Sequence, residues 1–252
     1  MEQNTSKESV QTPIMPTQSY LTPIAIVIAG GFIAAALYFS NAGGTTAVAP
    51  TPNAPVAQQQ GDATDNVRPV TKEDHIRGNP DASVIVVEYS DYECPFCKRF
   101  HDTMNAVIKK AGPDGDIAWV FRQFPLDQLH PKNARKVAIA SECANEQGGN
   151  DAFWKFTDRY MELTATNDRT DLTVVLPKIY SELGLDQSKM TSCIASGKYD
   201  KHVQDDVENA IATGGRGTPW SVVIGADGKT YPLNGAQPQS AVEQLLSLAA
   251  KK

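Results

Sequence analysis

The stretch VVEYSDYECPFCKRF, residues 86–100, decides how this chain is to be interpreted. An apolar, β-branched run ends in Glu88, and Cys94 and Cys97 follow with two residues between them. Strands favour β-branched residues, whereas Pro95 suits the first position of a helix because it has no N–H to leave unpaired. The stretch therefore predicts a strand followed directly by a helix that starts at the two cysteines.

Such a cysteine pair can bind a metal, hold the fold together or carry out redox chemistry. A structural zinc site needs four ligands, and the sequence shows neither a second cysteine pair nor histidines at paired spacing, so we expect no metal site. A disulfide across so short a loop restrains little of the unfolded chain. A redox pair fits best, because the unpaired N–H groups and the dipole of a first helical turn favour a thiolate. We assign Cys94 as the nucleophile and Cys97, one turn further in, as the resolving cysteine.

Composition limits the classes of function that the chain can have. The 252 residues are 41% hydrophobic and 21% charged, which is ordinary for a globular protein. The net charge of −6 argues against nucleic-acid binding, which needs a basic face. No glycine-rich phosphate loop follows a strand, because GGRG at 214–217 precedes one, so we expect no organic cofactor.

The N-terminal part carries a long uncharged segment, LTPIAIVIAGGFIAAALYF, at residues 21–39. As a helix it would be about 28 Å long, close to the thickness of a bilayer core. It predicts a single transmembrane anchor at 21–40, with a cleaved signal peptide as the alternative. We expect residues 1–20 to be a disordered cytoplasmic leader and residues 41–70, rich in Ala, Pro, Thr and Gln, to be a flexible linker.

The pattern of a folded α/β domain starts near Thr71 and continues to residue 252. On its first helix, Phe96, Phe100, Met104 and Val107 recur on one face. Asp227-Gly228 between two short apolar runs predicts a hairpin. We expect one domain with a parallel βαβ unit and a helical insert at about 131–212. The predicted strands are 83–89, 116–124, 220–224 and 230–233, and the predicted helices are 95–111, 131–147, 151–164, 171–184, 186–212 and 237–251.

Four segments, VVEYSDYECPFCKRFH, FRQFPLDQLHP, ASECANEQG and GGRGTPW, together resemble the DsbA-type branch of the thioredoxin-like superfamily. The resemblance covers about residues 70–250 and implies a thioredoxin-like fold with a helical insertion. It implies that Thr218-Pro219 is a cis-proline segment beside the redox pair, where it offers backbone groups to an extended substrate. We expect Pro95 and Phe96, between the cysteines, to contact the substrate as well.

Two further positions bear on the chemistry of the redox pair. Glu88 lies six residues before Cys94, where related proteins hold a buried acid, and a buried carboxylate with a raised pKa could exchange a proton with Cys97. The alternative is a half-exposed strand glutamate. Phe96 stands where the best-known strong oxidants of the family have histidine, and it cannot donate a hydrogen bond to the thiolate. We therefore predict a less oxidising reduction potential than with histidine there.

The two other cysteines, Cys143 and Cys193, lie in separate predicted helices of the insert. We expect a structural disulfide between them, which the chain-entropy model values at about 4 kcal/mol for a loop of roughly 50 residues. The alternative is a pair of buried free thiols that pack as small apolar groups.

These observations predict a membrane-anchored thiol:disulfide oxidoreductase whose domain lies on the periplasmic or extracellular side of the cytoplasmic membrane. Reduced or unfolded exported proteins would be its substrates, and the resemblance implies a quinone-linked membrane protein as reoxidant. A disulfide reductase or isomerase, a non-catalytic thioredoxin-like binding module and a metallochaperone remain as alternatives.

Overall fold

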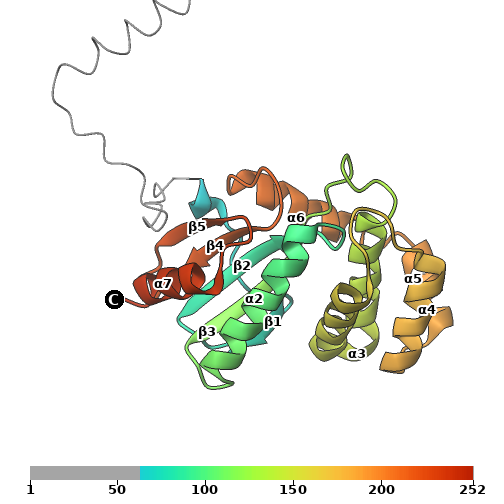
Figure 1. The fold of residues 1–252 in the computed structure, drawn as a ribbon, viewed down its shortest axis with the longest axis horizontal. Helices are drawn as coiled ribbons and strands as arrows, with labels where there is room; N and C mark the ends of the chain where they lie inside the picture. The colour runs from blue at the N-terminus through green and yellow to red at the C-terminus, as the bar shows by residue number, and fades with distance from the viewer. Residues whose placement is uncertain (1–62, 252) are drawn as a thin grey trace, which may run out of the picture. The chain divides into compact units, whose positions relative to one another are not determined.

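A five-stranded sheet with the strand order β1-β3-β2-β4-β5 lies at the centre of the fold (Figure 1). The structure, a computed structural model, describes residues 63–251. Strands β2 and β3 are parallel, and the other neighbouring strands are antiparallel. The strands are His75–Gly78 (β1), Val84–Ser90 (β2), Ile117–Gln123 (β3), Trp220–Ile224 (β4) and Thr230–Asn234 (β5).

Helices cover both faces of the sheet. Helix α2 (Pro95–Ala111) connects β2 to β3, and α7 (Gln239–Ala249) packs beside it, as Figure 1 shows. Because side chains alternate along a strand, Val86 of β2 joins the cluster under α2 and α7, while Val87 joins a second cluster with Ala210 of α6 (Asp200–Ala212). Because α2 connects the parallel strands β2 and β3, the predicted parallel βαβ unit is confirmed.

The helical insert between β3 and β4 contains α3 (Ala134–Leu163), α4 (Leu172–Leu183), α5 (Gln187–Ala195) and α6. Helices α3, α4 and α5 stand together beside the sheet (Figure 1). The predicted thioredoxin-like α/β fold with a helical insertion is confirmed by this arrangement.

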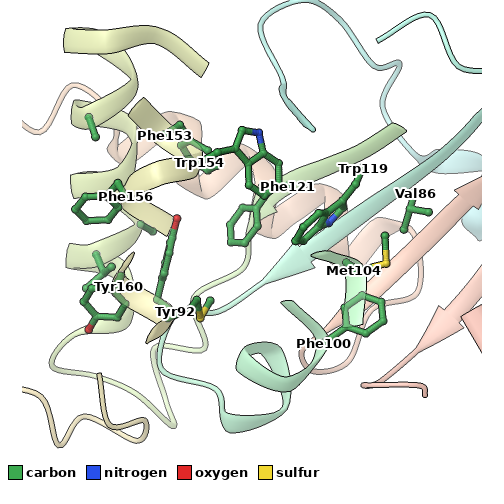
Figure 2. Close-up of a cluster of buried hydrophobic side chains, with 14 of the residues drawn as sticks. Val86, Tyr92, Phe100, Met104, Trp119, Phe121, Phe153, Trp154, Phe156 and Tyr160 are labelled. Carbon is green, nitrogen blue, oxygen red and sulfur yellow. The ribbon is translucent and has the colours of Figure 1, made fainter. Parts of the chain in front are cut away.

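A cluster of aromatic side chains joins the insert to the sheet (Figure 2). Tyr92, from the turn after β2, packs against Phe121 of β3 and edge-on against Tyr160 of α3. Trp154 of α3 meets Trp119 of β3 with ring centroids 4.7 Å apart. Large buried aromatic side chains dominate the energetics of a core, so insert and sheet share one core and form one domain.

Glycines mark the breaks between helices of the insert. The break predicted between 131–147 and 151–164 is confirmed, because Gly149 interrupts α3 with non-helical backbone angles, and its φ of 68° lies in the left-handed region that glycine tolerates. The segment predicted as helical at 186–212 contains two helices, α5 and α6, separated by a turn at Gly197, which also has a φ of 68°.

Two corrections concern the edges of the domain. The prediction missed β1, because HIRG is a four-residue edge strand without an alternating apolar pattern. Phe96 was wrongly grouped with the buried face of α2: it is 52% exposed, whereas Phe100, Met104 and Val107 are buried. It lies in the first helical turn, which carries it to the rim of the fold.

The N-terminal predictions fall mostly outside the described residues. The leader at 1–20, the anchor at 21–40 and most of the linker at 41–70 precede residue 63 and stay predictions. In residues 63–251 no helix has the length and apolar content needed to cross a bilayer. The end of the predicted linker packs on the domain, because Thr64 is buried and its hydroxyl lies 2.7 Å from that of Thr230. The packed domain thus starts before Thr71.

Candidate active site

The two central cysteines lie where β2 gives way to α2. Cys94 has extended backbone angles (φ −79°, ψ 121°) and is the N-cap residue of α2, and Pro95 occupies the first turn. The backbone N–H of Cys94 donates to the carbonyl of Asp91 at 3.1 Å, which closes the turn after the strand. Cys97 is fully buried, Cys94 is 5% exposed, and both are free thiols. The local sequence thus places the Cys94 thiol at a helix N-terminus, with the buried Cys97 one turn further along the helix.

The surroundings separate the pKa values of the two thiols. The pKa of Cys94 is lowered to about 6, chiefly by a hydrogen bond from the Cys97 thiol. The Thr218 side chain and the backbone N–H groups of Cys97 and Phe96 lower it further, against the effect of burial. Burial, followed by the interaction with Cys94, raises the pKa of Cys97 well above the ordinary thiol value. The pair can therefore hold one thiolate, at Cys94, and one proton, at Cys97.

A cis-proline loop lies directly beside Cys94. The Thr218-Pro219 peptide bond is cis, and the Cys94 thiol donates to the carbonyl oxygen of Thr218 at 3.4 Å. The loop leads into β4, in which Trp220 is paired with Tyr89 of β2. This antiparallel register brings residues that are 124 positions apart in the chain into contact at the sulfur.

Glu88 lies on β2 and is fully buried. The indole N–H of Trp119 donates to its Oε2 at 2.9 Å. Burial raises the pKa of Glu88 to about 7, against the opposing effect of Ser90 and Trp119, and the Cys94 charge raises it slightly more. The charge of Glu88 in turn raises the pKa of Cys97, so the acid and the buried thiol influence each other's protonation. The half-exposed alternative for Glu88 is excluded.

An ion pair between Asp91 and His130 supports the turn before Cys94. The sequence indicated a structural hydrogen bond for His130 but not its partner, Asp91. The backbone N–H of Asp91 points to the Cys97 sulfur at 3.4 Å, and the Asp91 carboxylate accepts from the backbone N–H of Leu126 at 2.7 Å. His130 Nδ1 lies 2.9 Å from the same carboxylate, which raises the pKa of His130 to about 9. The only sequence signals for this pair were an acid three residues before Cys94 and the LHP segment of the resemblance.

Glu93 ties the active-site turn to the helical insert. Its carboxylate accepts from the Tyr160 hydroxyl and from the backbone N–H of Asp168, both at 2.6 Å. Its carbonyl accepts from the backbone N–H of Asn167 at 2.8 Å. Asn167 and Asp168 have positive φ values of 63° and 57°, a conformation that these residue types tolerate better than most. The loop after α3 is thus held against the residue that precedes Cys94.

Cys143 of α3 and Cys193 of α5 form a disulfide with a Cα–Cα distance of 5.9 Å. The bond closes a loop of 50 residues within the insert. It joins two helices that already pack against each other, and it is separate in the chain from the Cys94–Cys97 pair.

The chain is similar to known thioredoxin-like proteins along this whole domain. The family model described as Thioredoxin matches residues 70–246. The structure of Pseudomonas aeruginosa DsbA2 is 26% identical, with a TM-score of 0.62, over 73% of this chain and 98% of that one. A thioredoxin-like oxidoreductase from Silicibacter pomeroyi is 25% identical, with a TM-score of 0.59, over 76% of this chain and 98% of that one. Bacillus subtilis BdbD, at 22% identity and a TM-score of 0.62 over 72% and 95% of the two chains, shares the fold.

The curated relatives that the chain matches are named as Na(+)/H(+) antiporters, not as thioredoxin-like proteins. The chain is 35% identical over 160 residues to the Na(+)/H(+) antiporter NhaA 1 of Mycolicibacterium gilvum, which is 63% of this chain and 25% of that protein. The chain thus spans about a quarter of the length of the curated relatives that it matches. The family model covers most of the chain, and the fold agrees with it. The chain belongs to the thioredoxin family, and its described domain is similar in structure to DsbA proteins.

Proposed function

We propose that this protein is a thiol:disulfide oxidoreductase that introduces disulfides into exported proteins through Cys94 and Cys97. The observation that carries the proposal is the placement of Cys94. Its sulfur lies at the start of α2, 3.4 Å from the Thr218 carbonyl next to cis-Pro219, with its pKa lowered to about 6. A thiol with a lowered pKa is a good leaving group, and the cis-proline loop beside it offers backbone groups that an extended client chain can pair with.

The first step is attack by a substrate thiolate on Cys94 in the oxidised Cys94–Cys97 pair. The Cys94–Cys97 bond breaks, a mixed disulfide forms between the substrate sulfur and Cys94, and Cys97 leaves with the electron pair. Because burial raises the pKa of Cys97, this sulfur takes up a proton. We assign Glu88 as the proton donor, because its pKa is about 7 and its charge raises the pKa of Cys97. The contact surface for the extended substrate is formed by Thr218, Pro219, Pro95 and Phe96.

The second step releases the product. A second substrate thiolate attacks the first substrate sulfur, the mixed disulfide breaks, and Cys94 leaves as a thiolate. The substrate is oxidised by two electrons, and the cysteine pair is reduced by two. Stabilisation of the Cys94 thiolate stabilises the reduced enzyme, which makes the oxidised enzyme the better oxidant and favours this direction. Neither step needs an organic cofactor or a metal.

The Cys143–Cys193 disulfide supports an oxidising compartment, because such bonds persist in the periplasm and outside the cell. We propose that the domain faces this compartment, held at the cytoplasmic membrane by the apolar segment at 21–40. A quinone-linked membrane protein would return the reduced pair to its disulfide.

The test is an exchange assay with the full chain in its oxidised form and a reduced, unfolded protein that has native disulfides. We expect two substrate thiols to disappear for each Cys94–Cys97 bond that is reduced. Faster reaction of the reduced chain with a disulfide substrate would instead assign a reductase. Exchange no faster than in the absence of the chain would contradict the proposal and favour a binding module.

Replacing Phe96 with histidine should make the chain more oxidising. Phe96 follows Cys94 by two residues in the chain, and its side chain has no hydrogen-bond donor. An imidazole at this position could donate a hydrogen bond to the Cys94 thiolate. If Phe96→His lowers the pKa of Cys94 by one unit, the reduction potential should rise by about 30 mV. Titration against glutathione measures this. Phe96→Leu is the matched control: an equal rise there would show that loss of the ring over Arg99, 4.8 Å away, is responsible.

Replacing Glu88 with glutamine should remove a pH dependence of stability. Between pH 4.5 and about 7 the unfolded Glu88 is ionised while the folded one keeps its proton, so stability falls as pH rises through this window. The wild type should therefore lose about 3 kcal/mol relative to Glu88→Gln between pH 4 and pH 8. Urea unfolding of both proteins, with Cys94 and Cys97 as thiols and Cys143–Cys193 intact, measures the difference. Parallel pH profiles would contradict the raised pKa of Glu88.

A further inference from the structure

A second group of ionisable side chains lies where β1, α3 and α6 meet, and the proposed redox chemistry does not use it. His75 Nε2 lies 2.8 Å from Glu142 Oε2, and His202 Nε2 lies 3.8 Å from the same oxygen. One ligand atom from each of the three residues lies within 4.8 Å of the others. The sequence alone does not indicate this group, because His75 and Glu142 are 67 residues apart and only the fold joins them.

Two of the three side chains are held firmly in place. His75 and Glu142 are buried, and the His75 imidazole stacks on Phe153 with ring centroids 3.5 Å apart. The other oxygen of Glu142, Oε1, accepts from Gln123 Nε2 at 2.7 Å. Supporting contacts of this kind orient metal ligands in proteins. The His202 side chain is 44% exposed, so the group is open to solvent on one side.

The three donor atoms suit a transition-metal ion. Bonds of about 2.0–2.1 Å in a tetrahedral zinc site place ligand atoms about 3.3 Å apart. The separations of 2.8 and 3.8 Å lie on either side of this value. To bind the ion, His75 and Glu142 would move apart by about 0.5 Å, and the exposed His202 side chain would rotate toward Glu142. Imidazole ligands select zinc and its neighbours, whereas calcium and magnesium take oxygen ligands.

Asp206 lies next to the group but is already engaged. Its Oδ2 is 3.9 Å from His202 Nε2 and accepts from the backbone N–H of Gln123 at 2.9 Å, while its Oδ1 pairs with Arg68. A water molecule is therefore the fitting fourth ligand.

We propose that His75, Glu142 and His202 bind one divalent transition-metal ion, with Zn²⁺ as the ion that fits best. Such an ion would connect the edge strand β1 to two helices of the insert. It would neutralise the buried Glu142 carboxylate and tie the insert to the sheet, beside the disulfide at Cys143.

The test is a Zn²⁺ titration of the full chain against a chromophoric chelator. The chain is first freed of metal and its Cys94–Cys97 pair is oxidised, so that these thiols cannot bind the ion. We expect one Zn²⁺ per chain in the micromolar range or tighter, and His202→Ala should weaken binding about tenfold or more through the loss of a ligand. Lys201→Ala, at a neighbouring and more exposed position of the same helix, is the matched control and should bind like the wild type.

A second readout uses Co²⁺ in place of Zn²⁺ on the same oxidised chain. Visible bands of a nitrogen- and oxygen-ligated ion, absent in His202→Ala, are expected. Glu142 is buried, so the variant Glu142→Gln can fail to fold. His202 is exposed and its replacement leaves the core intact, so His202→Ala tests the metal site without depending on that variant. Failure of the wild type to bind Zn²⁺ more tightly than millimolar, or equal binding by His202→Ala, would overturn the proposal.

Discussion

Replacing Cys94 with serine is expected to reduce thiol:disulfide exchange by the full chain to the uncatalysed rate. With its pKa lowered to about 6, Cys94 is about 90% thiolate at pH 7, against about 1% for an ordinary thiol with a pKa near 9. A serine hydroxyl is not ionised at this pH and cannot form the mixed disulfide. The loss of substrate thiols in the exchange assay measures the effect. The pH dependence of Cys94 alkylation in the wild type should have its midpoint near pH 6.

Cys97→Ser is the matched variant for this experiment. It keeps the nucleophile at Cys94 but removes the sulfur that resolves the mixed disulfide. We therefore expect it to accumulate a covalent complex with an oxidised substrate, visible on a non-reducing gel, that Cys94→Ser does not form. Full exchange activity in Cys94→Ser would contradict the catalytic role of Cys94, and an alkylation midpoint near pH 9 would contradict its lowered pKa.

Removing the Cys143–Cys193 disulfide is expected to cost about 2–4 kcal/mol of stability, because the bond restricts a loop of 50 residues in the unfolded chain. The double variant Cys143→Ala/Cys193→Ala should show a lower urea midpoint. Exchange activity at low temperature should be retained, since the bond lies in the insert and does not include the redox pair.

A reductant provides the control for lost packing. In a background with Cys94 and Cys97 both replaced by alanine, a reductant acts on the Cys143–Cys193 bond alone. It should lower the free energy of unfolding without changing any side chain, and it should have no effect on the variant that also lacks Cys143 and Cys193. An unfolding midpoint that does not respond to the reductant would contradict a stabilising role for the bond.

Local rules were enough to predict the elements around the cysteine pair. A β-branched run and a proline after Cys94 predicted β2 and the start of α2, because both signals act within a few residues. The parallel pairing of β2 and β3 followed, since a helix between two strands permits it. The same rules failed for β1, which pairs at the sheet edge through only four residues, whereas the two glycines at 148–149 correctly predicted the break between the two halves of α3.

Three features can be read from the amino-acid sequence alone: where the two sulfurs lie in the chain, which of them starts the helix, and which family the domain resembles. How strongly each nearby group holds a proton depends on the packed fold. Residues from separate elements produce these effects. They bury Glu88, bring His130 against Asp91, and bring Thr218 against Cys94. Desolvation and Coulomb interactions depend on distance in space rather than along the chain, so these effects exist only once the sheet and the insert have packed together.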